Sequence, residues 1–147
     1  MNNSILCKKH DESDGVNICF PKKEGDCGYD LIISKDTVVP PRQSYPTDVP
    51  CGVSIKIPDG YFGLIINRSS TSRKLGLWVV PGVIDCGYTG ELFACVYNMT
   101  PEEIKVGKGT RISQCIFLPI NTFPLCETNE LPSTERGTSG FGSSGLK

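Results

Sequence analysis

Histidine is almost absent from this sequence, since His10 is the only one in 147 residues. It lies in a polar N-terminal segment, so neither a Ser-His-Asp triad nor a Cys-His pair has a suitable general base. The eight cysteines include no CxxC pair, and a structural zinc site usually takes paired ligands at short spacing. Any hydrolytic chemistry must therefore rely on a carboxylate or on a metal ion.

Long apolar runs and an excess of basic residues are also missing. No stretch approaches the roughly 18 to 20 apolar residues that a membrane span requires. The N-terminus has neither the apolar run of a signal peptide nor the composition of a transit peptide. The 15 Lys and Arg residues balance 16 Asp and Glu residues, so we expect no stable nucleic-acid binding. These features predict a soluble intracellular protein, cytoplasmic or nuclear, without membrane attachment and with reduced cysteines.

Helical periodicity is nearly absent, and short stretches of alternating apolar and polar residues replace it. Residues 53–57 and 62–66 alternate on either side of a PDG turn, which predicts a β-hairpin. Further strands are predicted at 16–20, 30–34, 92–96 and 112–118. About eight to ten short strands in a chain of one-domain length indicate an all-β sandwich or barrel. One short helix is predicted around 69–76.

Two polar segments are candidates for binding an anion. CGYDL at 27–31 places Asp30 at the start of a strand, where a carboxylate can equally well cap a turn. NRSS at 67–70 puts a guanidinium and two hydroxyls just before the predicted helix, an arrangement suited to phosphate. The alternative is an ordinary serine N-cap followed by an exposed basic face.

The segment PGVIDCGYTGE at 81–91 is more specific. Its three glycines can bring main-chain amides and carbonyls close to the edge of a planar base. Asp85 and Tyr88 add one carboxylate and one aromatic face to the same loop. The alternative is a glycine-rich hairpin whose tyrosine belongs to the core.

The last twelve residues, RGTSGFGSSGLK, have the composition of a solvated linker. Linkers have no need of an aromatic ring, however, and this one contains Phe141. Glycine and serine groups can form a nest for phosphate oxygens, Arg136 can pair with a terminal phosphate, and Phe141 can stack on a base. The second hypothesis is therefore a flexible arm that becomes ordered over a bound anionic ligand.

The order of these segments suggests a family. CGYDL, NRSS, GVIDCGYTGE, GTRISQCIFLPI and RGTSGFGSSG resemble the five signature motifs of the trimeric dUTPases, across residues 27–145. This resemblance implies a jelly-roll-like β-barrel that assembles as a homotrimer, with three active sites at the subunit interfaces. It divides the chain into an N-terminal segment 1–24 that can add an edge strand, a core 25–126, and an arm 127–147 that closes a neighbouring subunit's site.

The resemblance also implies a reaction. It is the hydrolysis of dUTP to dUMP and pyrophosphate, with Mg²⁺ bound through the triphosphate. This reaction limits uracil incorporation into DNA and supplies dUMP for thymidylate synthesis. Asp85 is implied to be the general base that activates water for attack on the α-phosphorus. A carboxylate is ionised at neutral pH and can accept that proton.

Further roles follow from the same resemblance. The implied contacts to the base and sugar come from Gly82, Val83, Ile84, Tyr88, Gly90 and Phe141. Tyr88 is implied to pack under the deoxyribose and leave no room for a 2′-hydroxyl. The implied phosphate contacts come from Arg68, Ser69, Ser70, Gln114, Arg136, Gly142, Ser143 and Ser144. Asp30 is implied to act on the metal indirectly, through its water shell.

Two departures and two alternative functions accompany this interpretation. The family's second motif usually reads PRSG, whereas Asn67 and Ser70 stand here in place of the proline and the glycine. The related dCTP deaminases use a glutamate ten residues past the matching aspartate, and this chain has Cys95 there. A deaminase-like or bifunctional enzyme is one alternative, and a nucleotide-sensing binding module is the other. Separate incubations with dCTP and dUTP, followed by ammonia and pyrophosphate assays, distinguish them.

Overall fold

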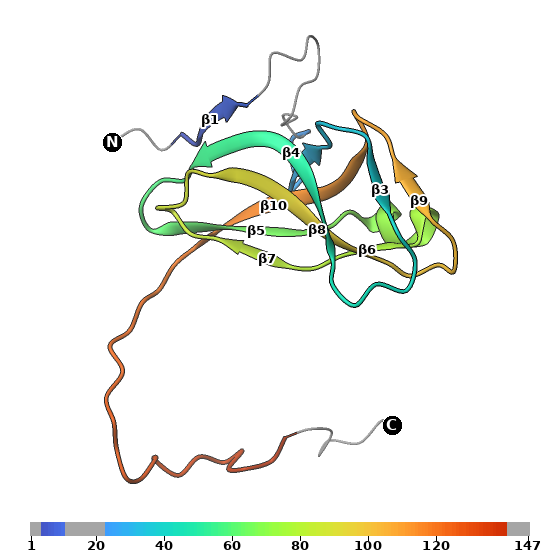
Figure 1. Cartoon of the computed structure of the whole chain (residues 1–147). Helices are drawn as coiled ribbons and strands as arrows, with labels where there is room; N and C mark the ends of the chain where they lie inside the picture. The colour runs from blue at the N-terminus through green and yellow to red at the C-terminus, as the bar shows by residue number, and fades with distance from the viewer. Residues whose placement is uncertain (1–3, 11–22, 141–147) are drawn as a thin grey trace.

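The computed structural model describes residues 4–10 and 23–140. Ten strands and one short helix occupy this part of the chain (Figure 1). They are β1 (Leu6–Lys9), β2 (Tyr29–Ile32), β3 (Thr37–Val39), β4 (Thr47–Lys56), β5 (Tyr61–Asn67), η1 (Thr71–Leu75), β6 (Leu77–Val79), β7 (Gly82–Ile84), β8 (Glu91–Asn98), β9 (Ile104–Val106) and β10 (Arg111–Pro119). The predicted all-β class with one short helix is confirmed, and the predicted strand at 16–20 lies outside the described residues.

The strands form two antiparallel four-stranded sheets and one two-stranded sheet. The first sheet has the order β1-β4-β8-β6, the second β2-β10-β5-β7, and β3 pairs with β9 at one end (Figure 1). β1 lies at the edge of the first sheet, where Leu6 pairs with Lys56. Within the described residues, no helix has the length and hydropathy needed to cross a membrane.

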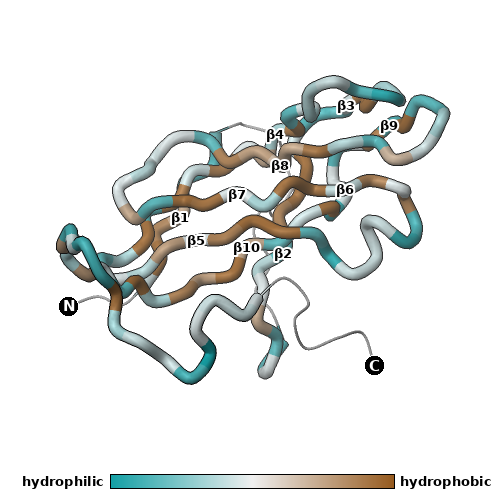
Figure 2. Tube along the Cα trace, turned by 90° about the horizontal axis from the view of Figure 1, so that it is seen from below, coloured by the Kyte–Doolittle hydropathy of each residue, from teal (hydrophilic) through white to brown (hydrophobic). Residues whose placement is uncertain are grey.

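The apolar core lies between the two large sheets, and both contribute to it. Along β8, Leu92, Ala94 and Val96 are buried while the residues between them are more exposed, as the alternation predicts. Figure 2 shows the hydrophobic segments on the strands and the hydrophilic ones mainly on the loops. The fully buried side chains with the largest volumes are Leu31, Ile33, Ile57, Leu77, Leu92 and Ile112.

The predicted hairpin between 53–57 and 62–66 is wrong. β4 pairs with β1 and β8 in the first sheet, whereas β5 pairs with β10 and β7 in the second. Ile57 is completely buried just before the PDG turn. The turn therefore carries the chain from one sheet to the other across the edge of the core. Alternation alone cannot distinguish this crossing from a hairpin, because both connect two amphipathic strands through a short turn.

The face that β5 turns to the core also differs from the alternation pattern. Gly63 and Ile65 point inward, while Phe62, Leu64 and Ile66 lie half-buried on the outer side of the second sheet. Apolar residues thus occupy both faces of this strand. A strand that reads as apolar on both faces needs cover on both.

The outer side of the second sheet is correspondingly apolar. On neighbouring strands Ile116 pairs with Leu64, and Leu64 pairs with Val83. Val83 is 64% exposed and Leu118 is 36% exposed. We call this surface the outer apolar face, and it consists of Leu64, Ile66, Val83, Ile116 and Leu118.

A β-bulge interrupts the start of β10. Arg111 pairs with Ile32 and Ser113 pairs with Leu31, so two steps along β10 match one step along β2. Ile112 and Ser113, the residues at the bulge, are both buried. The alternation of buried and exposed side chains along β10 is therefore shifted by one residue at the bulge.

The bulge decides which side chains of β10 leave the core. Side chains three residues apart point to opposite faces in a regular strand. Here Arg111 and Gln114 both lie on the outer side. The next residue, Cys115, is buried on the inner side. Regular alternation along the predicted strand 112–118 would put Ile112 on the same face as Gln114, but Ile112 is fully buried and Gln114 is not.

The helix η1 is held by one buried hydroxyl. Thr71 is 1% exposed, and its Oγ1 donates to the carbonyl of Ile112 at 2.6 Å. Gly76 ends the helix in the left-handed conformation, at φ 65°. Ser70 is the N-cap residue but makes no side-chain cap hydrogen bond. The interpretation of Ser70 as an ordinary hydroxyl cap is therefore wrong.

Two buried hydroxyls beside the bulge predict opposite effects on stability. Within the described residues, Ser113 Oγ is buried without a hydrogen-bond partner, whereas the Thr71 hydroxyl has one. Ser113→Ala removes a desolvated group and should leave the free energy of unfolding unchanged or raise it by up to about 1 kcal/mol. Thr71→Val should lower it by about 1 kcal/mol. Denaturant unfolding at one protein concentration measures both, and a Ser113→Ala variant less stable than Thr71→Val would contradict the assignment.

Candidate active site

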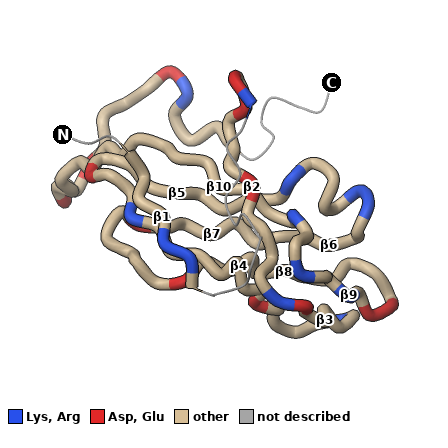
Figure 3. The backbone as a smooth tube through the Cα atoms, turned by 90° about the horizontal axis from the view of Figure 1, so that it is seen from above, with Lys and Arg blue, Asp and Glu red and all other residues tan. Residues whose placement is uncertain are grey.

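An open cleft of about 720 Å³ lies where β2, β5 and β10 come together. It is lined by Lys23, Gly25, Asp26, Cys27, Gly28, Asp30, Arg68, Ser69, Arg111 and Gln114. Three of these side chains are basic and two are acidic, so the lining carries a net charge of about +1. Figure 3 shows that β5 and β7, by contrast, carry no charged residue.

The charges in this cleft are joined through Asp30. Its Oδ1 accepts from Arg68 Nε at 2.7 Å, and its Oδ2 accepts from Arg111 Nη1 at 3.1 Å. The Asp30 side chain is 19% exposed and that of Arg68 is 26% exposed. The partly buried pair is less screened by solvent than an ordinary surface ion pair. Of these three residues, Arg111 had no role in the sequence-based assignment.

Gln114 lies beside this cluster, opposite Asp30 in the β2–β10 ladder. Its Nε2 donates to the main-chain carbonyl of Asn67 at 3.0 Å. Its Oε1 lies so close to Gly28 that a Cβ atom at position 28 would overlap it. Gly28 is therefore a glycine because the Gln114 carboxamide occupies the space of a side chain.

Asn67 also fixes the end of β5 with its own side chain. Its Oδ1 accepts from the main-chain amide of Val79 at 2.6 Å, which ties β5 to β6. A proline at position 67 could not make this bond. The departure from the family's second motif thus replaces a rigid ring with a hydrogen bond between the two large sheets.

Of the two predicted serines in this motif, only Ser69 lines the cleft. Ser69 is exposed there, whereas Ser70 is half-buried at the start of η1 and is not part of the lining. The structure thus brings together four predicted residues: Asp30, Arg68, Ser69 and Gln114.

The loop after β7 has a different character. Asp85 is exposed, and its carbonyl accepts from the amide of Tyr88 at 3.0 Å, closing a turn. The hydroxyl of Tyr88 donates to the carbonyl of Glu91 at 2.8 Å, and the ring lies against Gly90. Tyr88 is 43% exposed, so its ring faces solvent and the interpretation of it as a core residue is wrong.

The loop and the cleft are separate within one chain. Gln114 pairs with Ile66, whereas Ile84, the residue before Asp85, pairs with Gly63. Asp85 is therefore displaced by four residues along the sheet, or about 13 Å. Two strands, β10 and β5, also lie between β2 and β7. The cleft and the loop therefore do not adjoin within one chain.

The segment after β10 extends away from both sheets (Figure 1). Its first amide, on Ile120, donates to Gly60 at 2.8 Å. Arg136 is exposed, and its Nε donates to Ser139 in a turn of the segment itself, so it does not line the cleft. The predicted positions Phe141, Gly142, Ser143 and Ser144 lie outside the described residues.

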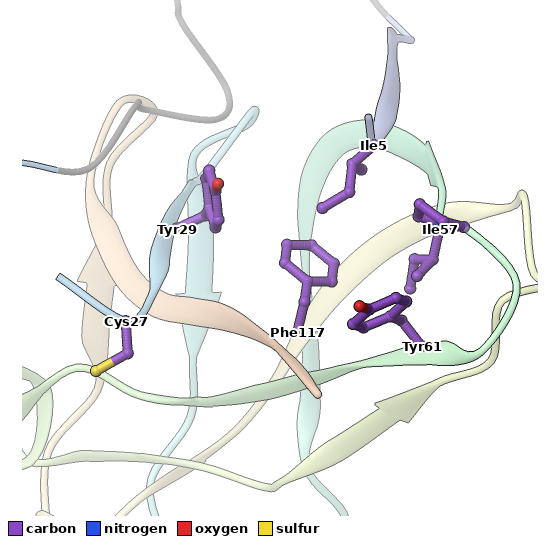
Figure 4. Close-up of a pocket in the computed structure, with 7 residues that line it drawn as sticks. Ile5, Cys27, Tyr29, Ile57, Tyr61 and Phe117 are labelled. Carbon is purple, nitrogen blue, oxygen red and sulfur yellow. The ribbon is translucent and has the colours of Figure 1, made fainter. Parts of the chain in front are cut away.

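A second pocket, of about 320 Å³, has the wrong chemistry for an anion. Figure 4 shows Ile5, Tyr29, Ile57, Tyr61 and Phe117 around it. The rings of Tyr29 and Phe117 meet edge to face with centroids 5.5 Å apart. None of the lining side chains is charged at neutral pH, so this pocket cannot neutralise a phosphate.

Cys95 occupies the position where a deaminase needs a carboxylate. Its thiol donates to Asp48 Oδ1 at 2.8 Å. Burial, together with the hydrogen bond to Asp48 and its negative charge, raises the pKa of Cys95 to about 11. The group is a protonated thiol at neutral pH and does not shuttle protons as a glutamate does.

Comparison with known proteins identifies the family. The dUTPase family model matches residues 14–145. The chain is 41% identical over 143 residues to the deoxyuridine 5′-triphosphate nucleotidohydrolase of Paramecium bursaria Chlorella virus 1, with coverage of 97% of this chain and 99% of the relative. The chain belongs to the dUTPase family.

Solved structures agree with this membership. The dUTPase of Staphylococcus bacteriophage 80alpha with dUPNHPP superposes with a TM-score of 0.89 at 28% identity, covering 98% of this chain and 99% of that one. A mutant dUTPase from phage phi11 of S. aureus, described with a structural Mg(II) ion, superposes with a TM-score of 0.78 at 23% identity, covering 87% and 98%. The activity that family and relatives establish is hydrolysis of dUTP.

Sequence reasoning missed two basic residues of the dUTPase cleft. Arg111 and Lys23 both line it. Arg111 is part of the fourth motif, but strand alternation gave no sign that it shares a face with Gln114. Only the bulge brings the two together, and nothing in the residue types predicts a bulge there.

The contact between Gly28 and Gln114 can be tested. Gly28→Ala forces the carboxamide of Gln114 out of place, and a misplacement of about 1 Å can lower turnover on the order of a hundredfold. Gly107→Ala is a matched control, because its new Cβ would meet no atom closer than 3.8 Å. Steady-state measurement of kcat and KM for dUTP hydrolysis by both variants tests this prediction. Wild-type kcat and KM in Gly28→Ala would show that the orientation of Gln114 does not matter.

Proposed function

We propose that this chain hydrolyses dUTP to dUMP and pyrophosphate by attack of water on the α-phosphorus, with Asp85 as the general base. The meeting of Arg68, Ser69 and Gln114 around one cationic cleft carries this proposal. Water attack on a phosphate asks the protein mainly for positioning and for neutralisation of charge. Both are available in the cleft.

Asp85 suits the role of base. It directly follows β7, and its carboxylate makes no hydrogen bond to the described part of the chain. An exposed carboxylate without a partner can accept a proton from water. Neighbouring glycines leave the main chain of 82–90 open to read the edge of uracil.

Tyr88 suits the role of a wall under the sugar. Its hydroxyl is already bound to the Glu91 carbonyl, and its ring lies on Gly90, so the ring has little freedom to turn. A fixed ring at this place leaves no room for a 2′-hydroxyl. Selection of a deoxyribose thus needs no further polar group.

The described residues fit a magnesium ion that arrives with the triphosphate. No three His, Cys, Asp or Glu side chains come together in 4–10 and 23–140, so this part of the chain offers no protein cage. Mg²⁺ is usually held by one or two carboxylates together with substrate phosphates. Asp30 is the carboxylate nearest the arginines of the cleft, and it would act through the water shell of the ion. When bound, Mg²⁺ neutralises phosphate charge.

We further propose that the core is a jelly-roll-like β-barrel that works as a homotrimer. One chain holds the phosphate residues and the base-reading loop at separate places, so a neighbouring copy must complete each site. The outer apolar face lies on the same sheet as Gln114 and offers a surface for that neighbour.

The segment after β10 supports the same assembly. Phe123, Leu125 and Leu131 are 81%, 100% and 84% exposed. Side chains so exposed are available for contact with another subunit. The arm 127–147 would then bring Arg136 and the following glycine-rich residues to a site on another subunit.

Asp85→Asn tests the base. The variant should bind dUpNHpp as the wild type does, because its shape is unchanged, while turnover falls by about a thousandfold. Asp59→Asn removes a carboxylate whose side chain is 95% exposed and is the matched control. Calorimetry and pyrophosphate release measure the two effects. Undiminished turnover in Asp85→Asn would remove Asp85 from the mechanism.

Mixing two inactive variants tests the division of the site. Asp85→Asn keeps an intact phosphate cleft, and Arg68→Gln keeps an intact base loop. After joint unfolding and refolding of equal amounts, about a quarter of the sites should combine one intact half from each variant. Activity should therefore return to about a quarter of the wild-type value. Variants refolded separately and then mixed briefly are the control, and no recovery after joint refolding would mean that each chain supplies its own complete site.

A further inference from the structure

Both oxygens of the Asp30 carboxylate are engaged by guanidinium groups. Oδ1 takes the Nε–H of Arg68, and Oδ2 takes an Nη1–H of Arg111. Asp30 therefore bridges two guanidinium groups, with one oxygen on each. A carboxylate with a single arginine prefers the bidentate geometry, in which both of its oxygens contact the same guanidinium.

Two of the three guanidinium nitrogens of Arg68 donate hydrogen bonds within the chain, and the third does not. Nε is bound to Asp30, and Nη1 donates to the main-chain carbonyl of Arg111 at 3.2 Å. Its Nη2 makes no hydrogen bond to the described residues. This nitrogen belongs to a side chain that lines the cleft, so its two N–H groups are available to an anionic ligand.

Arg111 controls whether Nη2 stays available. By occupying Oδ2, it prevents Asp30 from turning its second oxygen toward Arg68. It also supplies the carbonyl that holds Nη1. The Arg111 side chain is itself 46% exposed and comes from the residue that the bulge turns outward.

We propose that Arg111 is a positioning residue for the phosphate site: it holds Asp30 in a one-oxygen contact with Arg68 and so keeps the Nη2 edge of Arg68 free for the triphosphate. Asp30 then also orients Arg68. Without Arg111, Asp30 collapses onto Arg68 in a bidentate pair that competes with the substrate. This inference rests on the proposed phosphate-binding role of the cleft.

Arg111→Gln is the first test. It should raise both the Kd of dUpNHpp and the KM of dUTP by about tenfold, with little change in kcat, since the lost interaction acts on binding. Arg111→Lys keeps one charge and one donor for Oδ2 and should stay near the wild type. Arg73→Gln removes the same charge from an exposed position on η1 and is the matched control. Circular dichroism verifies the fold, and Arg111→Met replaces Arg111→Gln if that variant unfolds.

The decisive variant combines Arg111→Gln with Asp30→Asn. A neutral amide cannot form the charged bidentate pair, so the double variant should bind dUpNHpp more tightly than Arg111→Gln alone. Affinity equal to or weaker than that of Arg111→Gln would overturn the inference and make Arg111 a direct phosphate ligand. Wild-type Kd and KM in Arg111→Gln would overturn it too. A wild type that binds the analogue without hydrolysing dUTP would refute the proposed function, and the affinities would still test the inference.

Discussion

Asp30 joins three strand ends that are distant in the sequence. It belongs to β2, while its partners Arg68 and Arg111 lie just after β5 and at the start of β10. The order β2-β10-β5 brings these ends to one edge of the second sheet. The remaining features of the cleft follow from this contact, because Gln114 and the carbonyl of Asn67 take their places from the same strands. The cleft of mixed charge thus arises from strand register together with the segment 23–28, which adds Lys23 and Asp26 to its lining.

Strand alternation predicted some of this arrangement well. The inward residues of β8 have the expected burial, because this face meets the core directly. It failed for β5, whose two faces are both apolar. Period-two reasoning assumes that one face meets water, and this assumption breaks where a second protein surface is expected. It also failed at the PDG turn, since pairing partners are decided by contacts distant in the sequence.

The motifs predicted the membership of the site better than its assembly. Asp30, Arg68, Ser69 and Gln114, which the resemblance named, line one cleft, whereas Ser70 is set back and Arg136 lies away from it. Motifs record which residues act together, not which copy of the chain supplies them. The distance between Asp85 and the cleft is therefore information that only the strand register provides.

The bulge at the start of β10 has a consequence for how this segment can change in evolution. Its composition tolerates variation, since Ile112 needs only to fill the core and Ser113 gains nothing from its hydroxyl. The length of this segment, by contrast, does not tolerate change. Loss of one residue there would restore regular alternation and turn Arg111 away from the face that carries Asp30 and Gln114. Insertions and deletions in 111–113 should therefore be far rarer among functional descendants than substitutions.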